Sequence, residues 1–138
     1  MSLNLPQEAT ATPSPSQIVY IVDDDDHVRN STVALLKAAG IANRAYESGG
    51  AFLSALDASA GGCVLLDLHM PNLSGFQILA SMRERGSTLP VILFSGRADS
   101  VTEELAKQSG AVALLCKPIA PAQLVSRVRE ILAGNALG

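Results

Sequence analysis

Short hydrophobic runs recur along the chain, and each is followed by a polar residue. Short runs that are apolar throughout are typical of parallel strands covered on both faces of a sheet. The segments between them show the three-to-four-residue spacing of amphipathic helices. The runs are Ile18 to Val22, Cys63 to Leu66, Val91 to Phe94 and Val112 to Cys116, and they end on Asp23, Asp67, Ser95 and Lys117.

A shorter and more mixed segment, Ile41 to Tyr46, suits a strand at the edge of the sheet. Gly40 precedes it, at the position where glycine commonly ends a helix. Ser100 and Glu103 have the spacing of a capping box, which predicts the start of another helix. The expected helices follow the first strand and occupy Ser48 to Leu56, about Phe76 to Arg85, about Ser100 to Ser109, and the segment that Pro121 opens.

Five strands that alternate with five helices predict a doubly wound α/β fold with right-handed crossovers. In an open parallel sheet the carboxyl ends of the strands lie on one edge, and ligands bind there. The acids, the hydroxyl and the ammonium that follow the strands are therefore expected to converge.

Composition limits the classes of function. The longest unbroken apolar run, Ala111 to Cys116, is too short to span a membrane. The N-terminus lacks the basic and apolar segments of a secretory signal. Net charge is −3 and the ten basic residues are scattered, so this segment is not expected to bind nucleic acid. A cytoplasmic protein without membrane contact is predicted.

The 138 residues are enough for one domain. Residues 1–16, rich in Pro, Ser, Thr and Ala, are expected to be a disordered leader or a cloning remnant. The domain itself is expected at 17–134, followed by a tail at 135–138. Cys63 and Cys116 would lie at different heights in the sheet, so two buried thiols in a reducing compartment are expected.

Four consecutive carboxylates, Asp23 to Asp26, follow the first strand. Helix capping explains Asp25 or Asp26 but not the whole run. Adjacent carboxylates repel by about 1 kcal/mol at 4 Å even in water, and a bound cation offsets that repulsion. Oxygen ligands without a Cys or His cluster favour Mg²⁺, which also prefers phosphate as a co-ligand. A metal role is therefore predicted for Asp23 and Asp24.

The other strand ends suggest phosphoryl chemistry. A carboxylate beside Mg²⁺, here Asp67, can be both ligand and nucleophile and can take a phosphoryl group as an acyl phosphate. The Lys117 ammonium would neutralise that group, and the Ser95 hydroxyl could donate to one of its oxygens. The side chains of His27 and His69 are interpreted as solvated.

These pieces, in this order, resemble a bacterial two-component response-regulator receiver domain. The matching pieces are IVDDDD at 21–26, LLDLHMPNLSG at 65–75, VILFSG at 91–96 and the Lys117-Pro118 pair. The resemblance covers about 17–134. It implies a flavodoxin-like sheet of order 2-1-3-4-5. It also implies a cis Lys117-Pro118 bond.

The resemblance further assigns a role to each strand-end residue. Asp67 would be the phosphoacceptor, with a phosphohistidine on a sensor histidine kinase or phosphotransfer protein as donor. Asp23, Asp24, Asp67 and the backbone carbonyl of His69 would hold Mg²⁺. Ser95 would be the hydroxyl switch and Lys117 the phosphoryl-binding lysine.

The predicted function is that of a phosphorelay receiver, which promotes only its own phosphorylation and dephosphorylation and is otherwise not an enzyme. One alternative is a Mg²⁺-dependent phosphohydrolase of the haloacid-dehalogenase type, whose nucleophile would be the first Asp of the run. That class leaves Asp67 unexplained as an acceptor. Another alternative is a non-phosphorylated interaction module on the same fold.

Two residues depart from the resembled family, because Leu114 and Ile119 stand where it often has aromatic residues. A different output route is therefore predicted. The helix at about 100–109 has a thin apolar stripe, Val101 and Leu105, so it should move easily. Phosphate on Asp67 would draw Ser95 inward and displace this helix, where an output domain, a partner or a second copy forming a homodimer would dock.

Overall fold

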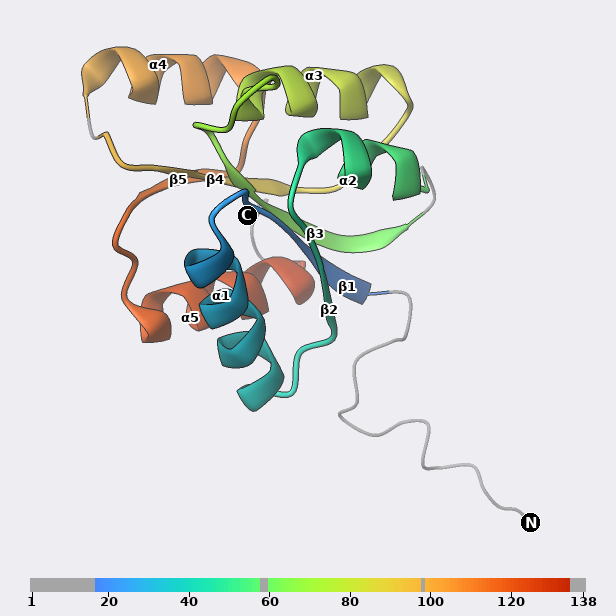
Figure 1. The fold of residues 1–138 in the computed structure, drawn as a ribbon, viewed down its shortest axis with the longest axis vertical. Coiled ribbons are helices and arrows are strands. Elements are labelled where there is room, and N and C mark those ends of the chain that lie inside the picture. Colours follow the sequence, from blue (N-terminus) through green and yellow to red (C-terminus); the bar gives the residue numbers. More distant parts are fainter. Residues whose placement is uncertain (1–16, 58–59, 98, 135–138) are drawn as a thin grey trace.

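The computed structural model describes residues 17–57, 60–97 and 99–134, and within them five parallel strands form one sheet of order β2-β1-β3-β4-β5 (Figure 1). The predicted fold class and strand order are confirmed. The predicted leader at 1–16 and the predicted tail at 135–138 lie outside the described residues. The strands are β1 (Gln17–Val22), β2 (Asn43–Tyr46), β3 (Gly61–Asp67), β4 (Val91–Ser95) and β5 (Ala113–Cys116), and the helices are α1 (Asp26–Ala38), α2 (Gly49–Ala55), α3 (Gly75–Glu84), α4 (Ser100–Ser109) and α5 (Pro121–Leu132).

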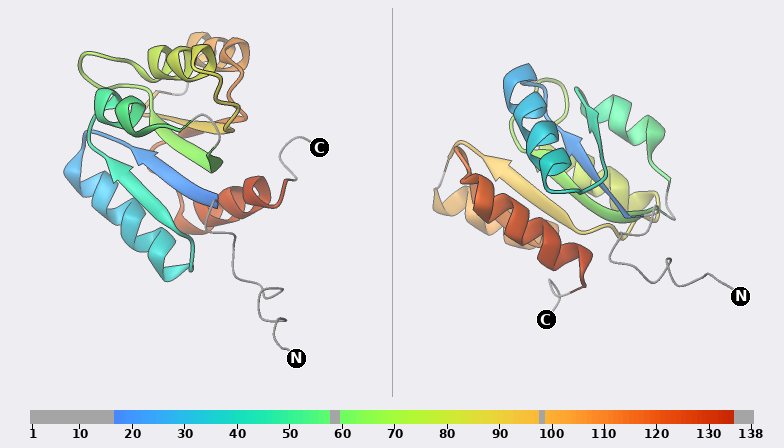
Figure 2. Two further views of the ribbon diagram at one scale, coloured as in Figure 1. Left: turned by 90° about the vertical axis from the view of Figure 1, so that its right-hand side faces the viewer. Right: turned by 90° about the horizontal axis from the view of Figure 1, so that it is seen from below.

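The helices cover both faces of the sheet, α1 and α5 on one and α2, α3 and α4 on the other (Figures 1 and 2). Side chains alternate along each strand, so neighbouring residues enter different cores. Val19 and Ile21 pack on the α1/α5 side, whereas Tyr20 and Val22 pack on the other. This double covering explains why the strands are hydrophobic throughout instead of alternating with polar residues.

Helix α4 differs from its prediction in two ways. Its N-cap is Asp99, whose side chain accepts a hydrogen bond from the Thr102 backbone, so no capping box forms at Ser100. Val101 and Leu105, the thin apolar stripe expected from the sequence, are 67% and 45% exposed and not buried. Only Ala106 of this helix is buried, because its small side chain faces the sheet. Helix α4 therefore exposes two large apolar side chains among its charged and polar residues.

The two thiols have different surroundings. Cys63 is fully buried, and burial raises its pKa to about 12. Cys116 is exposed, so the prediction of two buried thiols is wrong for this residue. Its strand, β5, lies at the edge of the sheet, where no further strand covers it. No helix in the described part of the chain is long and apolar enough to cross a membrane.

Candidate functional site

The register of the parallel strands brings the four predicted strand-end residues to one edge. Val22 pairs with Leu66, so Asp23 and Asp67 both follow at the same height. One strand further along, Asp67 pairs with Phe94, which immediately precedes Ser95. Lys117 follows the edge strand β5, and its backbone N–H donates to the Ser95 carbonyl at 2.8 Å.

The four consecutive aspartates divide into two pairs because α1 begins inside the run. Asp25 is the N-cap of α1, and its side chain accepts from the Val28 backbone N–H at 3.0 Å, which lowers the pKa of Asp25. Asp26 forms an ion pair with Arg29 one helical turn later. Asp23 and Asp24, the two acids predicted from the sequence to bind a metal, precede the helix and lie close to Asp67.

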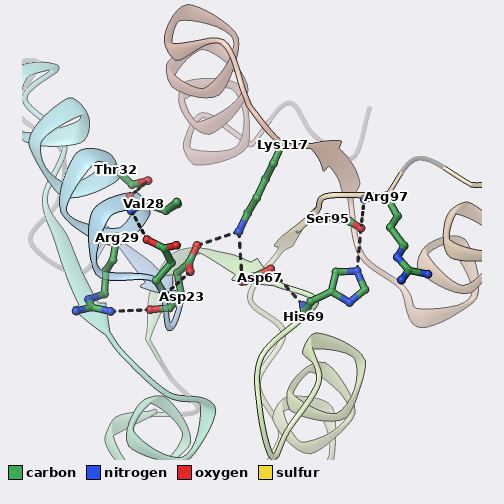
Figure 3. A network of polar contacts seen from close by, with 10 residues as sticks. Asp23, Val28, Arg29, Thr32, Asp67, His69, Ser95, Arg97 and Lys117 are labelled. Atoms are coloured by element: carbon green, nitrogen blue, oxygen red, sulfur yellow. Dashed lines mark hydrogen bonds and ion pairs between the residues drawn. The ribbon is translucent and has the colours of Figure 1, made fainter.

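A lysine bridges two buried carboxylates at the centre of the site (Figure 3). The Lys117 Nζ lies 3.3 Å from Asp23 Oδ2 and 3.3 Å from Asp67 Oδ2. Burial lowers the pKa of Lys117, but the two carboxylates outweigh that effect and raise it. The peptide bond that follows, Lys117-Pro118, is cis, as predicted. Lys117 therefore stays charged, between the two acids.

Burial has a larger effect on the pKa of Asp23 than the attraction of Lys117 has. Its pKa is raised by burial, and the nearby Asp67 carboxylate adds to that rise. A hydrogen bond from the Asp25 N–H at 2.9 Å and the attraction of Lys117 oppose the rise without cancelling it. Lys117 therefore does not fully offset the cost of ionising Asp23 in its buried position.

The acidic cluster is suited to a hard cation. Carboxylate oxygens of Asp23, Asp24 and Asp67 all lie within 4.8 Å of one another. The Lys117 ammonium contacts two of these three carboxylates, and the Arg29 guanidinium contacts the Asp23 backbone carbonyl and Asp26 instead. An all-oxygen set with excess negative charge fits Mg²⁺. Asp23 and Asp67 are buried, and Asp24 is open to solvent.

We expect Asp23→Asn to stabilise the metal-free protein, relative to the parent, increasingly as the pH rises. The pKa of Asp23 in the folded chain lies above its ordinary value of 3.8, so folding favours the protonated acid. The stability that this group contributes is present below that ordinary value and is lost as the pH rises through the raised pKa. Asparagine does not ionise and avoids the loss.

The measurement is urea unfolding of the parent and Asp23→Asn in EDTA at acidic and at neutral pH. The difference in the free energy of unfolding should grow toward neutral pH and shrink when Mg²⁺ is added to the parent. A difference that does not change with pH would contradict the argument from burial.

Ser95 is completely buried, and its hydroxyl has two partners (Figure 3). The Arg97 backbone N–H donates to Ser95 Oγ at 3.0 Å, and His69 Nε2 lies 3.1 Å from the same oxygen. The His69 backbone N–H also donates to Asp67 Oδ1 at 3.2 Å. His69 is exposed, as expected from the sequence, but its contact with Ser95 was not predicted. The two residues follow different strands, and nothing local signals their contact.

An open groove of about 540 Å³ borders Lys117. It lies between α1 and the segment that leads into α5, and its walls are mainly apolar. The side chains that line it include Val28, Leu35, Pro118, Ile119 and Leu124, with His27 at its edge. The groove thus offers a hydrophobic surface directly beside the charged cluster.

Comparison with known proteins gives consistent matches. The family model of the response regulator receiver domain matches residues 19–129. The response regulator protein TodT of Pseudomonas putida is 32% identical over 117 residues, which are 85% of this chain and 52% of TodT. The transcriptional regulatory protein FixJ of Azorhizobium caulinodans is 36% identical over 86% of this chain and 56% of FixJ. The chain therefore spans about half the length of these curated relatives.

The crystal structure of FixJ-N matches the fold with a TM-score of 0.78 at 28% identity. The match covers 85% of this chain and 94% of that structure. The similarity therefore extends over nearly the whole described α/β unit.

Proposed function

The chain belongs to the response regulator receiver domain family, the signalling modules of two-component systems, and from this premise we propose that Asp67 is its phosphoacceptor. The observation that supports this proposal best is the Lys117 ammonium, 3.3 Å from both Asp23 and Asp67. This ammonium sets a positive charge beside Asp67, the last residue of the central strand β3. The phosphohydrolase alternative leaves that acid without a role.

In the proposed reaction, a carboxylate oxygen of Asp67 attacks the phosphorus of a phosphohistidine. The new O–P bond forms as the P–N bond breaks, and the donor imidazole leaves. The His69 N–H orients the Asp67 carboxylate through Oδ1, and Lys117 at Oδ2 is placed to neutralise the incoming phosphoryl oxygens. The protein contributes positioning and electrostatics, which is most of what phosphoryl transfer requires.

We infer that Asp23, Asp24, Asp67 and the His69 backbone carbonyl would hold Mg²⁺. When bound, the cation supplies charge neutralisation to the carboxylates and to the phosphoryl oxygens. Three of these ligands are the acids whose oxygens cluster within 4.8 Å. Ser95 would donate its hydroxyl to a phosphoryl oxygen of the product.

The direct test treats the protein with acetyl phosphate and Mg²⁺ and measures its intact mass. One adduct of about 80 Da, the mass of one phosphoryl group, is the result expected for a receiver. Steady hydrolysis of p-nitrophenyl phosphate without an adduct would instead favour the phosphohydrolase. Neither uptake nor turnover would favour a non-phosphorylated interaction module.

The proposed donor is a sensor histidine kinase or a phosphotransfer protein. The apolar groove beside Lys117 could seat such a partner next to the acceptor. The output is proposed to lie in a further domain, as the relative named a transcriptional regulatory protein suggests, or in a separate partner. A cytoplasmic location remains a prediction.

We propose that α4 carries the output. The loop that leads to α4 starts directly after Ser95, and Val101 and Leu105 are exposed apolar side chains of this helix. Hydrogen exchange with and without beryllofluoride, a phosphoryl mimic, is expected to change over residues 95–119. Changes confined to the loop at 67–75 would contradict this route.

A further inference from the structure

We propose that the imidazole of His69 is a positioning residue that holds the Ser95 hydroxyl away from the acceptor and so opposes the phosphorylated state. The proposal rests on the proposed function, because it assumes that Asp67 accepts the phosphoryl group and that Ser95 responds to it. It concerns the side chain of His69, whereas the metal proposal uses only the backbone carbonyl.

The first support is the limited bonding capacity of one hydroxyl. Ser95 Oγ has two lone pairs and one hydrogen. The Arg97 N–H occupies one lone pair, and His69 Nε2, 3.1 Å away, engages either the hydrogen or the other lone pair. With either histidine tautomer, the oxygen is anchored at the His69 side.

The second support is burial. Ser95 has no exposed surface, so its hydroxyl cannot exchange His69 for bulk water. No hydrogen bond joins Ser95 to Asp67 among the described residues, although both lie at the same edge of the sheet. Figure 3 shows the His69 ring turned toward Ser95 and away from Lys117. Where Nε2 accepts the Ser95 hydrogen, a phosphoryl group on Asp67 would have to take that hydrogen from the imidazole. Where Nε2 donates, the phosphoryl group would have to draw the serine oxygen away from the imidazole.

The third support is that His69 can yield. His69 is exposed, and among the described residues its side chain makes one hydrogen bond, to Ser95. The ring can turn into solvent when the hydroxyl leaves. The contact thus opposes the movement of Ser95 without blocking it. The free energy of the His69–Ser95 hydrogen bond sets how strongly the phosphoryl group must compete for the hydroxyl.

The test is the affinity for beryllofluoride, measured in the presence of Mg²⁺ by ¹⁹F NMR titration. His69→Ala removes the competing bond and should bind the mimic more tightly than the parent, by about threefold to tenfold, which corresponds to one net hydrogen bond. His69→Gln, whose amide can bond the same hydroxyl, should return to parental affinity. Unchanged or weaker binding by His69→Ala, or equal tightening by His69→Gln, would overturn the proposal.

A double-mutant cycle shows whether the effect passes through Ser95. In the Ser95→Ala background, His69→Ala should leave the affinity unchanged. A tightening that persists there would mean that His69 acts on the bound group directly, which overturns the positioning role. Failure of the parent itself to bind beryllofluoride would overturn the phosphoacceptor assignment. A parent that binds as tightly as His69→Ala overturns the His69 proposal alone.

Discussion

Asp67→Asn is expected to take up no phosphoryl group from acetyl phosphate while the parent takes up one. The side-chain amide lacks the anionic oxygen that must attack phosphorus, so the loss should be complete. Asp25 and Asp26 are not placed to replace it, because their side chains cap α1 and pair with Arg29. Intact-mass measurement after treatment with acetyl phosphate and Mg²⁺ reads the result directly.

The matched control is Asp26→Asn, which makes the same chemical change in an exposed acid outside the cluster. It should be phosphorylated like the parent. Circular dichroism and thermal unfolding must show that Asp67→Asn remains folded, which is expected because the substitution preserves the shape of the side chain. A persistent adduct of about 80 Da on folded Asp67→Asn would refute the assignment.

Asp24→Ala is expected to weaken Mg²⁺ binding by more than about tenfold, the lower end of the loss seen when even an outer-shell partner of a metal site is removed. Asp24 is the exposed member of the three-carboxylate cluster, so its removal takes away one oxygen ligand without leaving a cavity in the core. The chain contains no tryptophan, so calorimetry is the suitable measurement of Mg²⁺ affinity.

Asp25→Ala is the neighbouring control. Asp25 caps α1 through the Val28 N–H, so its loss should reduce thermal stability and leave the affinity for Mg²⁺ unchanged. Equal Mg²⁺ affinity of Asp24→Ala and the parent would show that the metal site uses a different pair within 23–26.

Most of the fold was predictable because its signals are local. Each apolar run reads as a strand by itself, and the alternation with helices leaves few topologies to choose from. The order of the strands was expected from the resemblance. The structure differs mainly at element ends, as at β2, which begins at Asn43 instead of Ile41. The length of this edge strand depends on how far it can pair with β1, and not on the strand propensity of its residues.

The sequence predicted the location of a residue well when that location depends on a single strand end. Asp67 and Lys117 illustrate this, because each stands at the end of its strand and the two side chains meet. Properties that depend on how two distant segments pack together were not predicted. The sequence gives no sign that Val101 faces solvent while Ala106 faces the sheet, since that depends on how α4 sits on its neighbours.

The convergence of acids, a hydroxyl and an ammonium at one edge of a parallel sheet could be predicted from the sequence, because the polar residue at each strand end is part of a local pattern. The division of the four aspartates became visible only in the folded chain, since it depends on where α1 starts. The folded chain also shows that the His69 imidazole engages Ser95. The two residues are 26 positions apart and meet only when β3 and β4 pair.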